Sequence, residues 1–327
     1  MTRACDEGCF ACPVQASPLR FHRELDLNEA HRLIEQIHAM GIRRLVLTGG
    51  DPLKRPDIFE LIRFSRDLGL ETALFTLATR LLTREAIGHL HEAGLSSIVL
   101  AIDGSCSASH DALRGVAGSY RRTIAAARAC RRLGVVVEMR THVAGGNVGE
   151  LPAISRIVEG EGAALWSLAF RVDSGPTEAT RQISPEEFET ALRWLHAYSL
   201  TAPCAVDTIE APQFRRVSHE ESRRDPHSGR PEGPRERSFF VSHTGEVSPS
   251  PVFPAIAGST RTQRLAEIFD ASDVFRRLGE PDRLRGRCGT CPYRNLCGGS
   301  RARAFAASAD PLAEDPLCTY IPPGPEI

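Results

Sequence analysis

Cysteine is the residue type whose spacing in this chain points most directly to chemistry. Cys5, Cys9 and Cys12 lie close together near the N-terminus, at the spacing Cys-x3-Cys-x2-Cys. Three thiolates leave one position open on a tetrahedral zinc ion or on a four-iron cluster, because each usually takes four protein ligands. An open iron site can bind a substrate or a cofactor and so become a reagent. The alternatives are a zinc site completed by a distant residue such as His22, or three unrelated thiols.

A second group of cysteines lies toward the other end of the chain. Its members are Cys288, Cys291, Cys297 and Cys318. Four thiolates suit a structural zinc ion or a closed [4Fe–4S] cluster, and their spacing alone favours neither. Arg301 and Arg303 lie among these cysteines, either as ordinary surface charge or to tune a cluster or hold a substrate carboxylate. The remaining cysteines are expected to be ordinary free thiols: Cys106, Cys130 and Cys204.

The composition is that of a globular protein with no large charge excess. The 327 residues carry a formal net charge of −1, with 42% hydrophobic and 25% charged residues, which argues against a strongly basic nucleic-acid binder. No stretch approaches the ~20 apolar residues that cross a bilayer, and the first residues lack the apolar run of an export signal. We therefore expect a cytoplasmic protein, in which clustered cysteines are more often metal ligands than disulfides.

The residues between the two cysteine groups alternate between helix-like and strand-like segments. Five buried strands are expected, over 44–48, 71–76, 96–102, 135–143 and 164–170. Six helices flank or connect them, and the last begins at Ser184 with the pattern of a capping box. This alternation predicts a parallel α/β sheet or barrel. Ligands in such folds bind at the carboxyl ends of the strands, so a site is expected at that edge.

Residues 215–237 interrupt this alternation. The segment is charged and rich in proline and glycine, which predicts a mobile loop or linker. Beyond it, a hairpin is expected around Thr244-Gly245 and a helix over 265–278. We therefore expect three regions, namely a barrel over 1–205, a linker over 206–237 and a smaller domain over 238–327.

The segment CDEGCFAC resembles the signature loop of radical S-adenosylmethionine (SAM) enzymes. In that family three cysteines hold a [4Fe–4S] cluster, and SAM binds its fourth iron. Polar residues at successive strand ends also resemble SAM-facing positions of the family, with Asp51 in place of the commoner glutamate. The resemblance implies that these residues contact SAM: Gly49, Gly50, Asp51, Pro52, Thr76, Thr79, Asp103 and Arg140. His110-Asp111 and Arg114-Gly115 match the loop that follows in many members.

The family normally places a strand just before the cysteine loop, whereas four residues precede Cys5 here. The chain is therefore expected to form a partial (β/α)6 TIM-like barrel that lacks its first strand. A shortened gene model is the interpretation that we favour, because a missing strand would leave a sheet edge exposed beside the cluster.

The second cysteine group resembles the auxiliary-cluster domain called SPASM. The similar segment is CGTCPYRNLCGGSRARAFAASADPLAEDPLC. Complete SPASM domains bring more cysteines and two clusters, whereas four cysteines follow residue 204 here. The resemblance therefore implies one auxiliary [4Fe–4S] cluster. Such a cluster can accept an electron from a reaction that ends oxidised, or it can bind the substrate.

The implied activity is reductive cleavage of SAM to a 5′-deoxyadenosyl radical, which abstracts hydrogen from a substrate. The C-terminal segment most resembles enzymes of alternative haem and haem d1 biosynthesis, so oxidative decarboxylation or another side-chain modification of a tetrapyrrole is expected. Modification of a ribosomally made peptide or of another small molecule is the alternative. A flavodoxin-type or ferredoxin-type electron donor is implied in each case. The non-enzymatic alternative is a zinc-stabilised binding module, which would be colourless.

Overall fold

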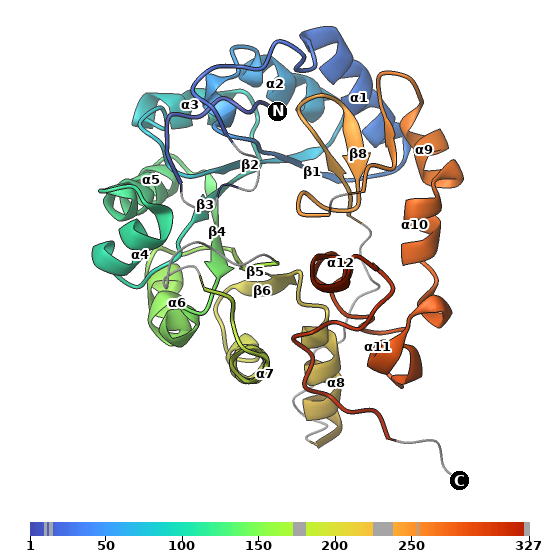
Figure 1. Cartoon of the computed structure of the whole chain (residues 1–327). Coiled ribbons are helices and arrows are strands. Elements are labelled where there is room, and N and C mark those ends of the chain that lie inside the picture. The colour runs from blue at the N-terminus through green and yellow to red at the C-terminus, as the bar shows by residue number, and fades with distance from the viewer. Residues whose placement is uncertain (10–11, 13–15, 173–180, 225–237, 254, 324–327) are drawn as a thin grey trace.

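The protein is described by a computed structural model, which covers residues 1–9, 12, 16–172, 181–224, 238–253 and 255–323. Its main sheet has six parallel strands in the order in which they occur along the chain. The strands are β1 (Arg44–Leu47), β2 (Glu71–Thr76), β3 (Ser97–Ala101), β4 (Val136–Val143), β5 (Leu165–Phe170) and β6 (Ala205–Ile209). The sheet curves into a half-barrel with helices on its outer face (Figure 1). The predicted parallel α/β barrel fold is thus confirmed.

The helices described in this region alternate with the strands. They are α1 (Leu27–Ala39), α2 (Ile58–Asp67), α3 (Arg84–Glu92), α4 (Ser107–Arg114), α5 (Ser119–Arg132), α6 (Leu151–Gly160), α7 (Pro185–Ser199) and α8 (Gln213–Arg224). Two short 3-10 helices, η1 (Pro52–Lys54) and η2 (Val148–Glu150), follow strand ends. None of the described helices is long and apolar enough to cross a bilayer.

Side chains that alternate along each strand separate the two faces of the half-barrel. Leu74, Leu100 and Met139 are buried in the main core, together with apolar residues of the surrounding helices. Because successive residues of a strand point to opposite faces, Phe75 and Arg140 lie on the inner, concave face. The concave face is therefore where polar strand residues collect.

One strand and one helix occupy part of the segment that was expected to be a linker. Strand β6 pairs with β5, so the barrel sheet extends beyond the expected limit at residue 205. Helix α8 covers 213–224, and residues 225–237 lie outside the described residues. The charged composition was misleading because the charges pair: Arg216 bonds to Glu189 of α7 and to Glu220 one turn along. The linker prediction was wrong for residues 206–224.

The residues before Cys5 form no regular strand within the described part of the chain. They instead run alongside the turn after β1, where the Gly50 N–H donates to Thr2 O at 2.7 Å and the Asp51 N–H donates to Ala4 O at 2.7 Å. Ala4 also forms an isolated bridge with Ser17. This short extended segment thus holds the start of the cysteine loop against the carboxyl end of β1.

The C-terminal part contains a small antiparallel sheet and short helices. The strands are β7 (Phe240–Val241), β8 (Glu246–Ser248) and β9 (Gly258–Ser259), so the hairpin expected around Thr244-Gly245 is confirmed. The helices are α9 (Leu265–Ala271), α10 (Asp273–Leu278), η5 (Pro281–Arg283), α11 (Gly286–Thr290) and α12 (Arg301–Ser308). The single helix expected over 265–278 is two helices, because Ser272 is extended and caps α10.

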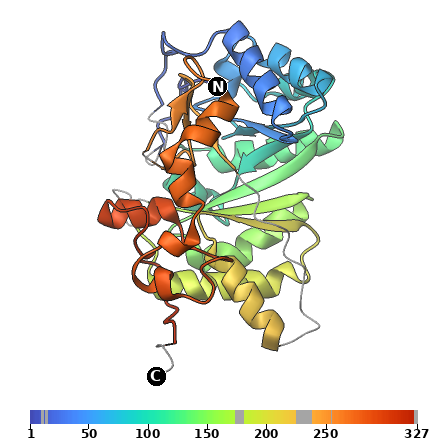
Figure 2. The same cartoon turned by 90° about the vertical axis from the view of Figure 1, so that its right-hand side faces the viewer.

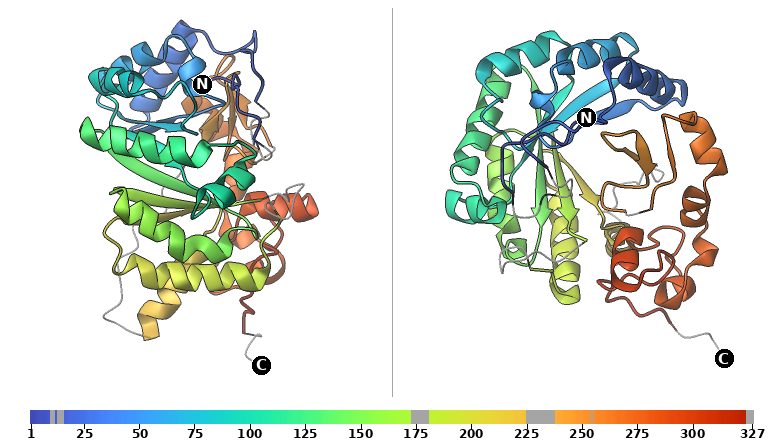
Figure 3. Two further views of the ribbon diagram at one scale, coloured as in Figure 1. Left: turned by 90° about the vertical axis from the view of Figure 1, so that its left-hand side faces the viewer. Right: turned by 45° about the horizontal axis from the view of Figure 1, so that its top comes forward.

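This C-terminal part lies across the open side of the half-barrel (Figures 1 and 3). Figure 2 shows α9 beside the first helix, with α10 continuing from it. Leu33 and Ile37 of α1 form one apolar cluster with Val247, Leu265 and Ile268, all of them buried. The two ends of the chain therefore share a core, although the limit of the C-terminal domain at residue 238 stays a prediction.

We predict that Leu265→Ala lowers the free energy of unfolding by about 2–5 kcal/mol, because it leaves a cavity in the shared core. Leu265 is 0% exposed, whereas Leu200 at the end of α7 is 43% exposed. Leu200→Ala is the matched control and should change the free energy by less than about 0.5 kcal/mol. Urea unfolding followed by circular dichroism measures both. Equal losses in the two variants would contradict the shared core.

Candidate metal and cofactor site at the strand ends

The first cysteine group lies at the carboxyl end of the main sheet. Cys5 is buried, and its sulfur accepts the Glu7 N–H at 3.4 Å. The Cys12 sulfur accepts the Ala16 N–H at 3.3 Å. Burial raises the pKa of the Cys5 thiol to about 11, opposed by the Glu7 bond and reinforced by the negative charges of Asp51 and Cys9. Such a thiol ionises readily only where a bound cation compensates its charge. Residues 10, 11 and 13–15 of this loop lie outside the described residues.

Two ion pairs tie this loop to the barrel. Arg122 of α5 donates to Glu7 at 3.0 Å and to the carbonyl of Ala78 at 3.1 Å. Lys54, at the end of η1, pairs with Asp6. These two ion pairs could not be predicted from the sequence, because a lone arginine or lysine far along the chain carries no spacing signal.

The Gly49-Gly50 turn approaches the cysteine segment so closely that no side chain fits. A Cβ atom at Gly49 would lie 2.3 Å from Thr2 O, and one at Gly50 would lie 2.6 Å from Ala4 O. Real Cβ atoms essentially never come so near to a backbone oxygen. Both glycines were predicted to contact SAM, and their geometry gives them a further role, because they allow the backbone that carries Cys5 to reach the sheet.

Asp51 and Thr79, two of the predicted SAM-contacting residues, lie together. Asp51 is 2% exposed and accepts the Thr79 hydroxyl at 2.6 Å and the Leu53 N–H at 3.0 Å. Burial raises the pKa of the Asp51 carboxyl above its ordinary value, and these hydrogen bonds oppose that change. Pro52 is buried as the first residue of η1.

Thr76 is placed differently from the other candidates. It aligns with Leu100 of β3, whose side chain is buried toward the helices, so alternation puts Thr76 on the outer side of β2 rather than on the concave face. Its hydroxyl is buried without a hydrogen-bond partner among the described residues. The structure therefore does not bring Thr76 to the inner face with Phe75.

Asp103, which follows β3, is the centre of a buried charge network. One carboxylate oxygen pairs with Arg114 Nε at 2.6 Å, and the other accepts the backbone N–H of His142 at 2.7 Å. Burial alone would raise the pKa of Asp103, but Arg114 and His142 outweigh burial and hold that pKa far below its usual range. Burial also raises the pKa of Cys9, and the Arg114 charge opposes that change. This network thus reaches the cysteine loop.

His110 completes the network in its neutral form. Burial lowers the pKa of His110 to about 4. Its Nδ1 accepts the Asp103 N–H at 3.0 Å, so Nε2 carries the proton and donates to Ser119 at 3.1 Å. The segment containing His110 and Arg114 was predicted to be a loop that follows the strand. It is instead helix α4, and both side chains contact Asp103.

Arg140 of β4 lies on the concave face. It is aligned with Ala101 of the neighbouring strand β3, and Phe75 lies on the next strand, β2. Its guanidinium carbon is 4.6 Å from the Phe75 ring centroid, which is a cation–π contact. Its Nε atom is buried with no hydrogen-bond partner among the described residues. A buried donor of this kind is satisfied when an anionic or carbonyl group binds beside it.

Deeper on the same face, Glu138 accepts two bonds from Arg44, at 2.7 and 2.6 Å, and one from Ser97 at 2.6 Å. This network was not predicted from the sequence. The available signal was a glutamate within an otherwise apolar strand.

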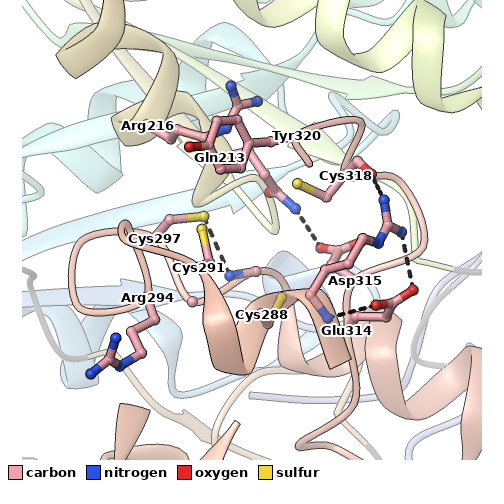
Figure 4. A pocket seen from close by; sticks show the side chains of 13 residues that line it. Gln213, Arg216, Cys288, Cys291, Arg294, Cys297, Glu314, Asp315, Cys318 and Tyr320 are labelled. Atoms are coloured by element: carbon pink, nitrogen blue, oxygen red, sulfur yellow. Dashed lines mark hydrogen bonds and ion pairs between the residues drawn. The ribbon is translucent and has the colours of Figure 1, made fainter. Parts of the chain in front are cut away.

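The four cysteines of the second group line one cavity. Figure 4 shows their thiol groups directed toward a common space. No three His, Cys, Asp or Glu side chains of the described residues are placed to hold a single metal ion. Burial raises the pKa of Cys297 to about 12, and the Gly299 N–H donates to its sulfur at 3.4 Å.

Helix α8 contributes to this second cavity, which the sequence analysis did not foresee. Gln213 and Arg216 of α8 line it. Gln213 donates to Asp315 at 2.6 Å, and Asp315 also pairs with Arg303 at 2.8 Å. Burial raises the pKa of Cys291 and of Cys318, and the Arg216 charge opposes that change at both thiols. The cavity is thus built jointly by the barrel and the C-terminal part.

We predict that Gly50→Ala displaces the segment that carries Cys5 and reduces the iron bound by the first cysteine group. A matched control is Gly88→Ala in α3, where an added Cβ meets nothing within 4 Å. Iron content after anaerobic reconstitution is the measurement, with the second group mutated to alanine so that only the first is counted. Equal iron in the two glycine variants would show that the close approach is dispensable.

We also predict that Asp103→Asn destabilises the fold by about 3–5 kcal/mol at pH 7, because Arg114 then stays buried without a counter-charge. The depressed pKa of Asp103 contributes stability above the unfolded value of 3.8 that is lost as the pH falls. The difference between parent and variant in urea unfolding should therefore shrink below about pH 4. Asp67→Asn is the control, since Asp67 pairs with Arg66 at the surface. A pH-independent difference would refute the ion-pair account.

Comparison with known proteins shows which family this chain resembles. The profile described as the radical SAM superfamily matches residues 1–150. The AdoMet-dependent heme synthase of Methanosarcina barkeri is 32% identical over 333 residues, covering 98% of this chain and 95% of that protein. The pre-heme d1 synthase of Dinoroseobacter shibae is 29% identical, covering 97% and 84%. The PqqA peptide cyclase of Rhodopseudomonas palustris is 28% identical, covering 95% and 84%.

A solved structure supports the same fold. Streptococcus suis SuiB bound to S-adenosylmethionine superposes with a TM-score of 0.75 at 15% identity, covering 98% of this chain and 76% of that chain. Radical SAM proteins bind a [4Fe–4S] cluster and SAM, and three thiols on one loop at the strand ends fit that cluster in number and in place. The family profile, the full-length relatives and the fold agree, and the chain is an enzyme of the radical SAM superfamily.

Proposed function

We propose that Cys5, Cys9 and Cys12 hold the [4Fe–4S] cluster to which SAM binds. Support comes from the backbone N–H groups that donate to the sulfurs of Cys5 and Cys12, and from the Arg114 charge beside Cys9. When bound, the cluster and SAM supply a 5′-deoxyadenosyl radical that abstracts hydrogen from an unactivated carbon. The protein orients the reactants and excludes water.

Of the residues predicted to contact SAM, some are proposed to bind a ligand directly and the others to shape the site. Gly49 and Gly50 act through the cysteine segment that they admit, while Asp51 and Thr79 provide a hydrogen-bonded acceptor for the SAM amino group. Arg140 binds a carboxylate with its buried Nε. Pro52, Thr76 and Asp103 then act by shaping the strand ends, because both carboxylate oxygens of Asp103 already have partners and Thr76 lies on the outer side of β2.

The second cysteine group is proposed to hold one auxiliary [4Fe–4S] cluster. Its thiols surround a cavity rather than a single point, which suits a four-iron cluster better than one zinc ion with sulfurs about 2.3 Å from it. The Arg216 charge and the Gly299 N–H favour the thiolate form of these cysteines. All four protein ligands are present, so this cluster serves in electron transfer.

The substrate is proposed to be a tetrapyrrole with propionate side chains, which undergoes oxidative decarboxylation. The observation that carries this proposal is the end-to-end similarity to AdoMet-dependent heme synthases. Removal of a hydrogen atom from the side chain, followed by loss of carbon dioxide, leaves a vinyl group and one excess electron. That electron needs an acceptor, and the auxiliary cluster provides one. A flavodoxin-type or ferredoxin-type protein is proposed to reduce the first cluster.

Modification of a ribosomally made peptide is the second candidate. It is favoured by the similarity to a PqqA peptide cyclase over 95% of this chain. The two candidates share the SAM chemistry and differ only in the molecule that loses hydrogen.

The test uses reconstituted full-length protein, SAM, dithionite and an iron tetrapyrrole that carries propionates. We predict release of 5′-deoxyadenosine and a product that has lost carbon dioxide and two hydrogen atoms per side chain, both measured by mass spectrometry. The Cys5/Cys9/Cys12→Ala variant should release none, whereas Cys106→Ala, at an exposed thiol, should match the parent. Cleavage of SAM by the triple variant would refute the cluster assignment. Cleavage by the parent with an unchanged tetrapyrrole would refute the substrate assignment.

A further inference from the structure

The two arginines among the second group of cysteines have different surroundings. Arg303 is 1% exposed, and its Nε and one terminal nitrogen donate to Asp315 at 2.8 and 2.9 Å. The same side chain also donates to the carbonyl of Glu210 at 2.9 Å and lies over the Phe188 ring. Arg303 therefore joins the end of β6 to the C-terminal part and has no bond to a cysteine among those described.

Arg301 is held so that it donates to a cysteine sulfur. Its Nε donates to Gly299 O at 3.2 Å, and one terminal nitrogen donates to the carbonyls of Pro311 and Ala313 at 2.9 and 2.7 Å. The other terminal nitrogen lies 3.8 Å from Cys288 Sγ, within hydrogen-bond range for sulfur. Three carbonyls thus fix the guanidinium while one edge faces the thiol. This argues against capture of a substrate carboxylate.

The backbone at Gly299 is shaped to allow this contact. The residue has a φ of +67°, and a Cβ atom there would lie 2.6 Å from the Arg301 terminal nitrogen and 3.4 Å from Cys288 Sγ. A side chain would therefore intrude between donor and sulfur. The Gly299 N–H in turn donates to Cys297 Sγ. One short segment thus supplies hydrogen-bond donors to two of the four cysteines.

Hydrogen bonds and positive charge at ligand sulfurs stabilise the reduced, more negative state of an iron–sulfur cluster. We infer that Arg301 is a positioning residue that raises the reduction potential of the cluster on the second cysteine group, so that this cluster can accept the electron left by substrate oxidation. The inference rests on the proposed auxiliary cluster. The oxidised cluster gains one electron as carbon dioxide leaves the substrate radical, which becomes a closed-shell alkene.

The experiment measures the potential of this cluster alone. The full-length chain carries the Cys5/Cys9/Cys12→Ala changes, and Arg301→Gln is compared with Arg285→Gln, whose side chain is 70% exposed and pairs with Asp310. Redox titrations are followed by electron paramagnetic resonance. We expect Arg301→Gln to lower the ratio of reduced to oxidised cluster about tenfold at a fixed ambient potential, or about 59 mV for one electron, and Arg285→Gln to leave it unchanged.

Arg301→Lys keeps the charge and loses the planar fork, so we expect a smaller shift in the same direction. It decides the question if Arg301→Gln does not retain its iron. If both Arg301 variants have the potential of the parent, the role of Arg301 is overturned and the auxiliary cluster is not. If Arg301→Gln loses its iron, the same result in Arg301→Lys alone overturns that role. Unchanged iron content on Cys288→Ala would instead refute the auxiliary cluster itself, and the inference with it.

Discussion

The close approach of the N-terminal backbone to the turn after β1 is the contact on which the first site depends. Two glycines leave space that any other residue would fill, and the N–H groups of Gly50 and Asp51 then bind the carbonyls of Thr2 and Ala4. This contact fixes the start of the cysteine loop at the carboxyl edge of the sheet. The loop residues Asp6 and Glu7 are then held by Lys54 and Arg122. This backbone contact, together with the two ion pairs, keeps the thiols near the Asp51 carboxylate and the Arg114 charge.

The second cavity depends on charged side chains that come from distant parts of the chain. Arg216 of α8 is almost fully buried and held by glutamates of α7 and α8, so its positive charge is fixed beside the cysteines. The buried Asp315 carboxylate accepts hydrogen bonds from the Gln213 side chain and the Ser300 backbone N–H, and it pairs with Arg303. A buried charge is tolerated when it is paired. The Asp315 network forms only when the barrel, which supplies Gln213, and the C-terminal part, which supplies Asp315 and Arg303, are docked. The two cysteine groups thus belong to one framework.

The sequence was sufficient to predict those strands whose burial requires a continuous run of apolar residues. Five strands were predicted because they are apolar runs, whereas β6 was missed because none of its residues is fully buried. Helix α8 was missed because its pairing charges resemble those of a flexible segment. Residue type and spacing marked out both cysteine groups, and the clusters proposed for them came from the resemblance to radical SAM enzymes. The partners of Asp103, the outward placement of Thr76 and the different surroundings of Arg301 and Arg303 depend on contacts between distant segments, which spacing in a sequence does not encode.

The core shared by α1 and the C-terminal part also bears on how the protein is made. Leu33 and Ile37 leave the ribosome early, but Val247, Leu265 and Ile268 are synthesised more than two hundred residues later. At roughly 5–20 residues per second, the apolar face of α1 lacks these partners for about 10–40 seconds. The core around this face of α1 can therefore close only after the C-terminal part has been made.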